Sequence, residues 1–203
     1  MRIGIVVGSH RKESESGRVG RYLQRQLDAM DSVETWLMDL GKAPLPMWDE
    51  ALFSGGEQWG FVGELSTRLH ATDAFILISP EWHGMVPSAL KNFLMLWAGT
   101  GELAHKPALL VTLSVVDGGA TPIAELRMSS YKNNRICYMP EQLVIRNVGS
   151  VLHDDDTQNN PDAHQYFVDR SKYCLELLVE YGKAFQTIRA SGKGSLEAYP
   201  NGM

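Results

Sequence analysis

Residues 8–16, Gly-Ser-His-Arg-Lys-Glu-Ser-Glu-Ser, gather hydrogen-bond donors directly after an apolar run. The segment carries hydroxyls at Ser9, Ser14 and Ser16 and a guanidinium at Arg11, and a helix pattern follows it. Hydroxyls, a guanidinium and the free N–H groups of a helix N-terminus are donors that bind phosphate. The segment therefore predicts a phosphate-binding loop, although Ser14 or Ser16 could serve only as the N-cap of the helix. It has neither the GxGxxG nor the GxxxxGK[ST] pattern.

Two other loops have unusual compositions. Residues 79–87 place an aromatic ring, an imidazole and a carboxylate between prolines, and Trp82 could stack on a flat heteroaromatic ligand. Residues 114–119 are small or turn-forming, so their backbone N–H groups can approach a ligand closely. Each loop also has an ordinary interpretation: Trp82 as a core residue, Glu81 as a partner of a helix dipole, and Gly118-Gly119 as a simple turn.

Short β-rich runs alternate with amphipathic helical stretches along the chain, which predicts a doubly wound α/β sandwich with a parallel sheet. The three loops follow the first, third and fourth predicted strands. Ligands of such sheets bind beyond the carboxyl ends of the strands, so the loops should share one rim. The expected strands are 2–7, 33–38, 74–78, 108–113 and 142–148, and the expected helices are 19–30, 59–69, 87–97, 120–135 and 167–185.

Length and charge limit the class of protein. The chain has 203 residues, with 24 acidic and 19 basic side chains and a net charge of −5. This length suits one core, so we expect one domain at 1–190 and a loose tail at 191–203. The weak acidity provides no polybasic stripe, which argues against a nucleic-acid partner and against a dedicated electron carrier. We expect no membrane insertion and a cytoplasmic location.

Few other residues suggest chemistry. Cys137 and Cys174 lie 37 positions apart without CxxC spacing, and we expect buried thiols there. His153 precedes three consecutive aspartates, but consecutive carboxylates cannot all face one ion, so we predict no metal site.

Three motifs, in order, resemble the NADPH-dependent FMN reductase family, which also includes quinone, azo and chromate reductases. The family's GSxRxxSxS loop is matched at residues 8–16, and its LPxxxxD element resembles Leu45-Pro46-Met47-Trp48-Asp49, with Glu50 beyond it, at a shorter spacing. Its PEYNxSxPxxLKNxxDW signature is matched from Pro80 to Trp97. The resemblance covers about four-fifths of the chain and implies a flavodoxin-like three-layer sandwich with strand order 2-1-3-4-5.

The resemblance also implies the ligands and the residues that bind them. Bound FMN and a nicotinamide donor, NADPH or NADH, are expected. The FMN phosphate would lie on the first loop, the isoalloxazine on the second and its pyrimidine side on the third. The implied cofactor-binding residues are Ser9, Arg11, Ser14, Glu15, Ser16, Pro80, Glu81, Trp82, His83, Gly84, Ser114, Asp117, Gly118 and Gly119.

Several residues depart from the family pattern. Trp82 replaces the usual tyrosine, His83 the usual asparagine and Leu96 the aspartate of the closing DW. We expect His83 to lie beside the flavin, where it could donate a proton to an acceptor or only fill the asparagine position. Arg11 or Arg18 could contact a phosphate of NADPH.

The expected function is FMN-dependent reduction of a flavin, quinone or similar small acceptor by ping-pong hydride transfer from NAD(P)H. The partner would be a small-molecule electron acceptor, and the assembly a homodimer or homotetramer. The alternative is a flavin-binding electron-transfer or redox-sensing protein without steady NAD(P)H turnover.

Overall fold

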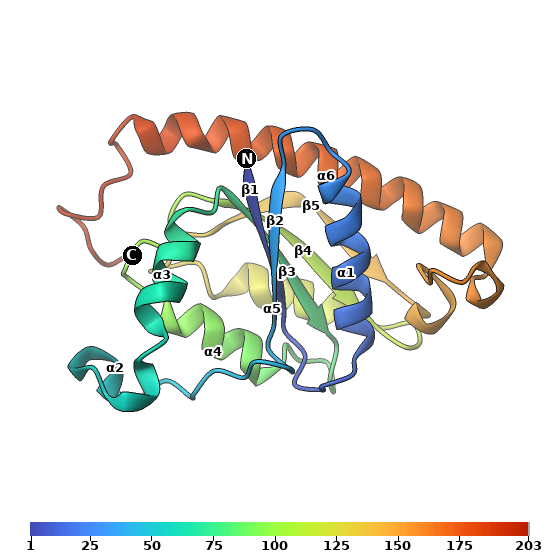
Figure 1. Ribbon diagram of the computed structural model, residues 1–203, viewed down its shortest axis with the longest axis horizontal. Coiled ribbons are helices and arrows are strands. Elements are labelled where there is room, and N and C mark those ends of the chain that lie inside the picture. The colour runs from blue at the N-terminus through green and yellow to red at the C-terminus, as the bar shows by residue number, and fades with distance from the viewer. Residues whose placement is uncertain (203) are drawn as a thin grey trace.

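The apolar runs of the sequence pair as a five-stranded parallel sheet in the order β2-β1-β3-β4-β5, which confirms the predicted order. The computed structural model describes residues 1–202, and Figure 1 shows helices on both faces of the sheet. The strands are β1 (Arg2–Val7), β2 (Glu34–Asp39), β3 (Ala74–Pro80), β4 (Pro107–Leu113) and β5 (Cys137–Ile145). The helices are α1 (Glu15–Asp28), α2 (Ala51–Ser54), α3 (Val62–His70), α4 (Ser88–Leu96), α5 (Ala120–Met128) and α6 (Pro161–Ala190).

Both faces of the central strands are buried because side chains of a strand alternate between the faces. In β3, Ile76 and Ile78 join a core cluster with α1 and α6, whereas Phe75 and Leu77 join a second cluster with α3, α4 and α5. The continuous apolar runs of the sequence reflect this double burial. The helices therefore form two outer layers, which position the loops at the carboxyl ends of the strands.

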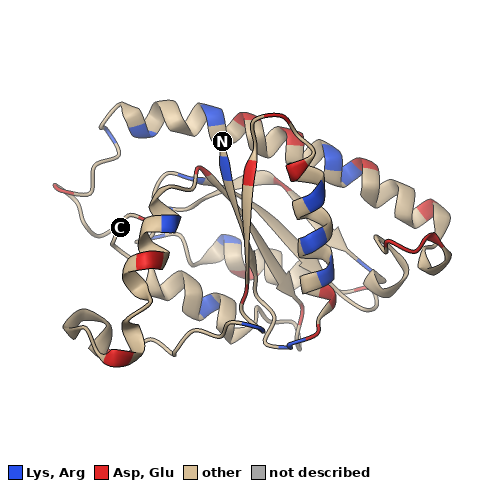
Figure 2. Cartoon of the chain, in the orientation of Figure 1, with Lys and Arg blue, Asp and Glu red and all other residues tan. Residues whose placement is uncertain are grey.

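Strand order reverses between β1 and β3, since β2 lies on one side of β1 and β3 on the other. The loops after β1, β3 and β4 therefore meet at one end of the sheet, as the three sequence segments predicted. Figure 2 shows that basic and acidic residues are mixed along α6 and α1.

Several element boundaries differ from the sequence prediction, and α6, expected at 167–185, extends from Pro161 to Ala190. The helix expected at 120–135 ends at Met128, where the Ser129 and Ser130 hydroxyls donate to carbonyl oxygens of the last turn and compete with helix continuation. The strand expected at 142–148 is β5, which starts at Cys137 and ends at Ile145. The pairing shifts register where the two steps from Ala108 to Leu110 in β4 oppose the four steps from Tyr138 to Gln142, so the early part of β5 bulges away from β4.

The expected helix at 59–69 is divided. Trp59 belongs to a separate 3₁₀ turn, Glu57–Trp59, and α3 begins at Val62. Pro87 is the N-cap of α4 and precedes its first turn. Single 3₁₀ turns also occur at Val148–Ser150 and Asp156–Gln158.

The structure contains no disulfide between the two cysteines of residues 1–202. Cys137 and Cys174 are both free; Cys174 is fully buried, as expected, whereas Cys137, on the edge strand β5, is only half-buried. The segment after α6 folds back toward the α5–β5 loop, where the Arg135 guanidinium donates to the carbonyl oxygens of Tyr199 and Pro200.

No helix in residues 1–202 is both long and apolar enough to cross a membrane.

Candidate functional site

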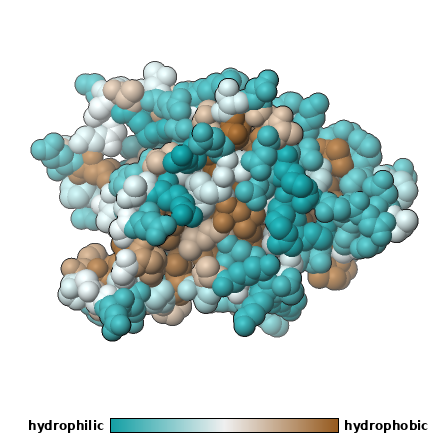
Figure 3. Space-filling view, viewed as in Figure 1, coloured by the Kyte–Doolittle hydropathy of each residue, from teal (hydrophilic) through white to brown (hydrophobic). Residues whose placement is uncertain are grey.

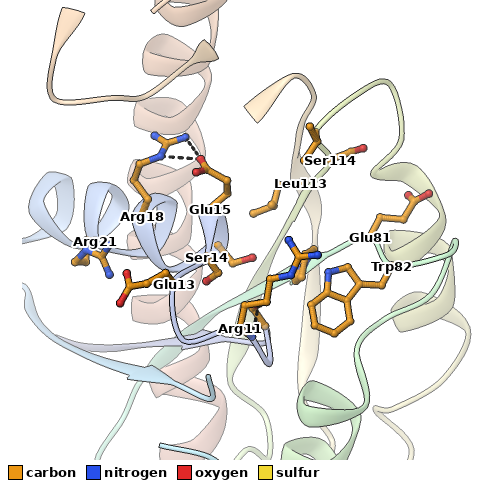
Figure 4. A pocket seen from close by; sticks show the side chains of 14 residues that line it. Arg11, Glu13, Ser14, Glu15, Arg18, Arg21, Glu81, Trp82, Leu113 and Ser114 are labelled. Carbon is orange, nitrogen blue, oxygen red and sulfur yellow. Dashed lines mark hydrogen bonds and ion pairs between the residues drawn. The ribbon is translucent and has the colours of Figure 1, made fainter. Parts of the chain in front are cut away.

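A cavity of about 510 Å³ lies where the loops after β1, β3 and β4 meet, within the size range of small-molecule sites. Figure 4 shows Ser14 and Arg11 on one side and Glu81, Trp82 and Ser114 on the other. The lining residues are Ser9, Arg11, Glu13, Ser14, Glu15, Ser16, Arg18, Arg21, Pro80, Glu81, Trp82, Leu113, Ser114 and Val115.

The first loop ends in the first turn of α1. Ser14 is the N-cap, with extended backbone, and its Oγ accepts the Gly17 N–H at 3.0 Å. The Ser9 hydroxyl accepts the Arg11 N–H at 3.2 Å. Ser16 is 1% exposed, and its Oγ has no hydrogen-bond partner within the part of the chain that the structure describes. An unpaired buried hydroxyl is costly, so its place in this cavity wall points to a ligand that pairs with it.

Gly8 brings the first loop close to α4. A Cβ at this position would lie 2.8 Å from both the Ile78 carbonyl oxygen and the Leu90 Cβ. The Gly8 N–H donates to that same Ile78 oxygen at 2.8 Å. The loop therefore leaves the sheet tightly packed, with its donors directed to the cavity.

Residues 82–85 form a two-residue turn in which both central residues have left-handed backbone, with φ of 51° at His83 and 75° at Gly84. Trp82 and Met85 exchange both backbone hydrogen bonds, at 3.2 and 2.9 Å. This is the backbone of a type I′ turn, which favours Asn-Gly. Histidine is among the residues that tolerate left-handed backbone, which explains how His83 occupies the asparagine position.

The structure brings nine of the implied cofactor-binding residues to the cavity wall and leaves five outside it. The nine are Ser9, Arg11, Ser14, Glu15, Ser16, Pro80, Glu81, Trp82 and Ser114. Those outside are His83, Gly84, Asp117, Gly118 and Gly119. The His83 imidazole is exposed on the turn.

Glu81 links the second and third loops. Its carboxylate accepts the Gly119 N–H, and a Cβ at Gly118 would lie 3.0 Å from its Oε1. Arg146 Nε donates to the Asp117 carbonyl oxygen at 2.7 Å, on the other side of the loop. Gly118 and Gly119 therefore let the third loop pack against Glu81. Glu81 both lines the cavity and holds this loop through its hydrogen bond with the Gly119 N–H.

Glu125 of α5 contacts the residue that follows the Trp82 turn, Val86, and the neighbouring helix α4. Its carboxylate accepts the Val86 N–H at 2.7 Å and pairs with the Lys91 ammonium of α4. Burial acts to raise the pKa of this carboxyl, but the hydrogen bonds from Lys91 and Val86 outweigh it and hold the pKa below its usual value. The second loop is therefore tied to both helices beneath it.

Several cavity residues were not predicted from the sequence: Glu13, Arg21, Leu113 and Val115. Arg18 was predicted only as a contact for NADPH. Its guanidinium donates to Glu15 and to the carbonyl oxygens of Val148, Val151 and Leu152. These bonds occupy the Arg18 guanidinium within the protein. Glu15 and Arg18 are three positions apart on a helix, a spacing from which their ion pair could have been predicted.

The LPxxxxD element packs against α4 through Asn92. The buried Asn92 amide accepts the Trp48 N–H at 2.9 Å and donates to the Pro46 carbonyl oxygen at 2.8 Å. Asp49 accepts the indole N–H of Trp59 at 3.1 Å. Two of the motifs seen in the sequence are thus in direct contact.

The donor set of the cavity fits the phosphate of FMN. The buried Ser16 hydroxyl, the α1 N-terminus and the Arg11 guanidinium all lie on the first-loop side. Across the cavity, Trp82 provides an aromatic surface, and the Arg11 Cζ lies 5.6 Å from its ring centroid. A negatively charged group and a flat ring, joined by a short chain, match these two sides.

The family model for NADPH-dependent FMN reductase matches residues 1–149. The chain belongs to this family. An NADPH azoreductase of Bacillus sp. (strain OY1-2) is 30% identical over 168 residues, which cover 80% of this chain and 84% of the relative. A quinone reductase of Pseudomonas putida is 26% identical over 181 residues, which cover 86% and 95% of the two chains.

Solved structures of flavin-related enzymes share the fold of this family member. The flavoenzyme NAD(P)H:(acceptor) oxidoreductase FerB from Paracoccus denitrificans aligns with a TM-score of 0.70 and 21% identity, over 91% of this chain and 98% of its own. The apo form of the NADH:FMN oxidoreductase EMOB aligns with a TM-score of 0.62 and 14% identity, over 100% and 94%. These likenesses confirm the flavodoxin-like sandwich.

Proposed function

We propose that the chain binds FMN in the cavity and uses NADPH or NADH to reduce a small acceptor: a free flavin, a quinone or an azo compound. Family membership supports this proposal, as do the quinone reductase and azoreductase named among its relatives. The observation that carries it in this chain is the buried, unpartnered Ser16 hydroxyl beside the N-terminus of α1. That hydroxyl lies where the family's phosphate loop requires a donor.

The first loop would hold the phosphate of FMN. Ser9, Ser14 and Ser16 supply hydroxyls, and the exposed Arg11 supplies a guanidinium whose Cζ lies 5.6 Å from the Trp82 ring centroid. Glu15 would act differently, since its carboxylate lines the cavity but pairs with Arg18, which offsets its negative charge. The loop thereby binds and orients one end of the cofactor.

The second and third loops would hold the flavin ring. Pro80, Trp82 and Ser114 line this side, and Glu81 fixes the third loop through Gly119. Asp117, Gly118 and Gly84 would contribute backbone at the edge. When bound, FMN supplies the redox chemistry, accepting hydride from a nicotinamide and passing reducing equivalents to the acceptor. The chain's own task is to leave one ring face accessible and to place N–H donors against the other edge.

His83 remains our candidate for proton donation to an acceptor. Its imidazole is exposed on the turn beside Trp82, so it can reach a ligand at the cavity mouth but lines no part of the wall. A His83→Asn variant, which suits the type I′ turn, isolates the imidazole from the backbone shape. If the variant keeps the acceptor turnover and the pH profile of the parent, His83 has only a conformational role.

Steady-state kinetics test the proposed reaction. The FMN-reconstituted protein is assayed with NADPH or NADH and with a quinone or an azo dye, at several fixed acceptor concentrations. We expect turnover with parallel double-reciprocal lines, the pattern of a ping-pong reaction. Absence of turnover with bound FMN would favour the electron-transfer or redox-sensing alternative.

We also propose a homodimer or homotetramer of a domain at 1–190, in the cytoplasm. Exposed Met47, Trp48 and Phe53 provide an apolar surface for a second copy. Figure 3 shows hydrophobic atoms low on the visible face, around α2 and the chain that leads to it. The two free cysteines suit a reducing compartment.

A further inference from the structure

His10 lies on the phosphate loop but lines no part of the cavity. Its Nε2 is 3.2 Å from the Ala89 backbone nitrogen and 2.9 Å from Ser88 Oγ, both in the first turn of α4. Its ring stacks on the Trp82 indole, with centroids 5.3 Å apart and an interplanar angle of 25°. One side chain therefore joins the first loop, the Trp82 turn and α4.

The start of α4 requires such a partner. The first N–H groups of a helix have no acceptor within the helix, and an N-cap side chain usually supplies one. Here the N-cap is Pro87, which makes no side-chain hydrogen bond. His10 Nε2 supplies the missing acceptor from another segment of the chain.

The contact fixes the protonation state of His10. A backbone N–H can only donate, so Nε2 must be the nitrogen without a proton and the ring proton must lie on Nδ1. Protonation of Nε2 would leave the Ala89 N–H without this acceptor and would place a cation beside Arg11, which lies over the same indole.

The charged groups around His10 do not compensate for that loss. Among residues 1–202, no carboxylate forms an ion pair with its imidazole. Glu81 accepts the Gly119 N–H, and Glu125 pairs with Lys91. The charged side chains on the His10 loop are Arg11, Lys12 and Glu13, those on the Trp82 loop and the start of α4 are Glu81 and Lys91, and Glu125 of α5 pairs with Lys91.

Trp82 forms the aromatic side of the cavity, and His10 backs its indole from outside the wall. We propose that His10 is a positioning residue: it holds the indole in the plane that receives the flavin and makes FMN affinity fall when Nε2 is protonated. This inference rests on the proposed function.

Three substitutions separate the two contacts. His10→Gln keeps an acceptor near the Nε2 position but does not titrate, His10→Phe keeps an aromatic stack without the acceptor, and His10→Ala removes both. His153→Gln is the matched control, because its Nε2 is 3.0 Å from the Gly149 carbonyl oxygen and outside the cavity wall. Circular dichroism and urea unfolding verify that each variant is folded.

FMN titrations at pH 8 and at pH 5.5 give the first readout. For the parent and His153→Gln, we expect the Kd for FMN to be about tenfold higher at the lower pH, the effect of one lost hydrogen bond. His10→Gln should show a smaller pH dependence than the parent, that of the FMN phosphate alone, and His10→Phe should bind more weakly than the parent at pH 8. Equal affinities and equal pH profiles in the parent and all His10 variants would overturn the inference.

Hydrogen exchange of the Ala89 amide, measured by NMR without FMN, gives the second readout. Protection should persist in His10→Gln and fall about tenfold in His10→Phe and His10→Ala. Unchanged protection would overturn the capping contact. If exchange responds as expected but the parent does not bind FMN, the proposed function fails while the capping contact stands.

Discussion

Replacing Ser16 with alanine should weaken FMN binding without reducing the stability of the free protein. The Ser16 hydroxyl is buried in the cavity wall without a partner, so its removal relieves a cost that an unsatisfied buried group imposes. We expect the free energy of unfolding in urea to be unchanged or to rise by up to about 2 kcal/mol. The lost hydrogen bond to a charged phosphate corresponds to about 1.5–3 kcal/mol, or a Kd for FMN at least about tenfold higher.

Two variants control this experiment. Ser171→Ala removes another buried, unpartnered hydroxyl, on α6 and outside the cavity wall, and should change stability similarly while leaving FMN affinity unchanged. Ser14→Ala removes the N-cap and should lower stability by about 1 kcal/mol as well as weakening FMN binding. Riboflavin, which has no phosphate, should bind the parent and Ser16→Ala equally. If Ser16→Ala binds FMN as the parent does, the phosphate does not lie at the first turn of α1.

Three further perturbations test the fold around the site. Gly8→Ala places a Cβ 2.8 Å from the Ile78 carbonyl oxygen and should reduce the free energy of unfolding by about 1–3 kcal/mol; parental stability would contradict the tight packing of the loop. Burial raises the pKa of Cys174 to about 11, so at pH 8 this thiol should react with a thiol reagent far more slowly in the native protein than in urea. Fast native labelling at this position would show that α6 opens. Burial lowers the pKa of Lys106 from 10.5 to about 8, so between these values the unfolded chain binds more protons and the free energy of unfolding should rise with pH. In Lys106→Met that rise should be smaller by up to about 3 kcal/mol, and equal pH profiles would refute the shift.

The sequence predicted the fold well because its strongest signals are also the most buried elements. The runs that became β1, β3 and β4 are apolar on both faces, and their loops carry the chemistry-bearing residues. The edge strand β5 was placed only in part, since Pro140 interrupts its early portion and β5 is partly exposed. The end of α5 was missed because two serine hydroxyls, not a glycine or proline, end that helix.

The site was predicted in composition but not in its internal contacts. Spacing placed Ser16 and Trp82 on one rim, yet it could not show that the Ser16 hydroxyl lacks a partner or that Glu81 fastens Gly119. His10 was overlooked as well, because its partners lie 72 and 79 positions away in the chain, at Trp82 and Ala89. Contacts between residues so far apart in the sequence form only in the folded chain, so local sequence patterns do not reveal them.

If this chain binds FMN and reduces it with a nicotinamide, the bound flavin must respond to NADPH or NADH. To measure this response, the purified protein is reconstituted with FMN, oxygen and free flavin are removed, and the visible flavin absorption is recorded after NADPH or NADH is added. We expect the absorption of the bound flavin to bleach with one equivalent of NADPH or NADH and to recover when a quinone is added. A protein that does not retain FMN, or a bound flavin that neither nicotinamide bleaches, would contradict this expectation.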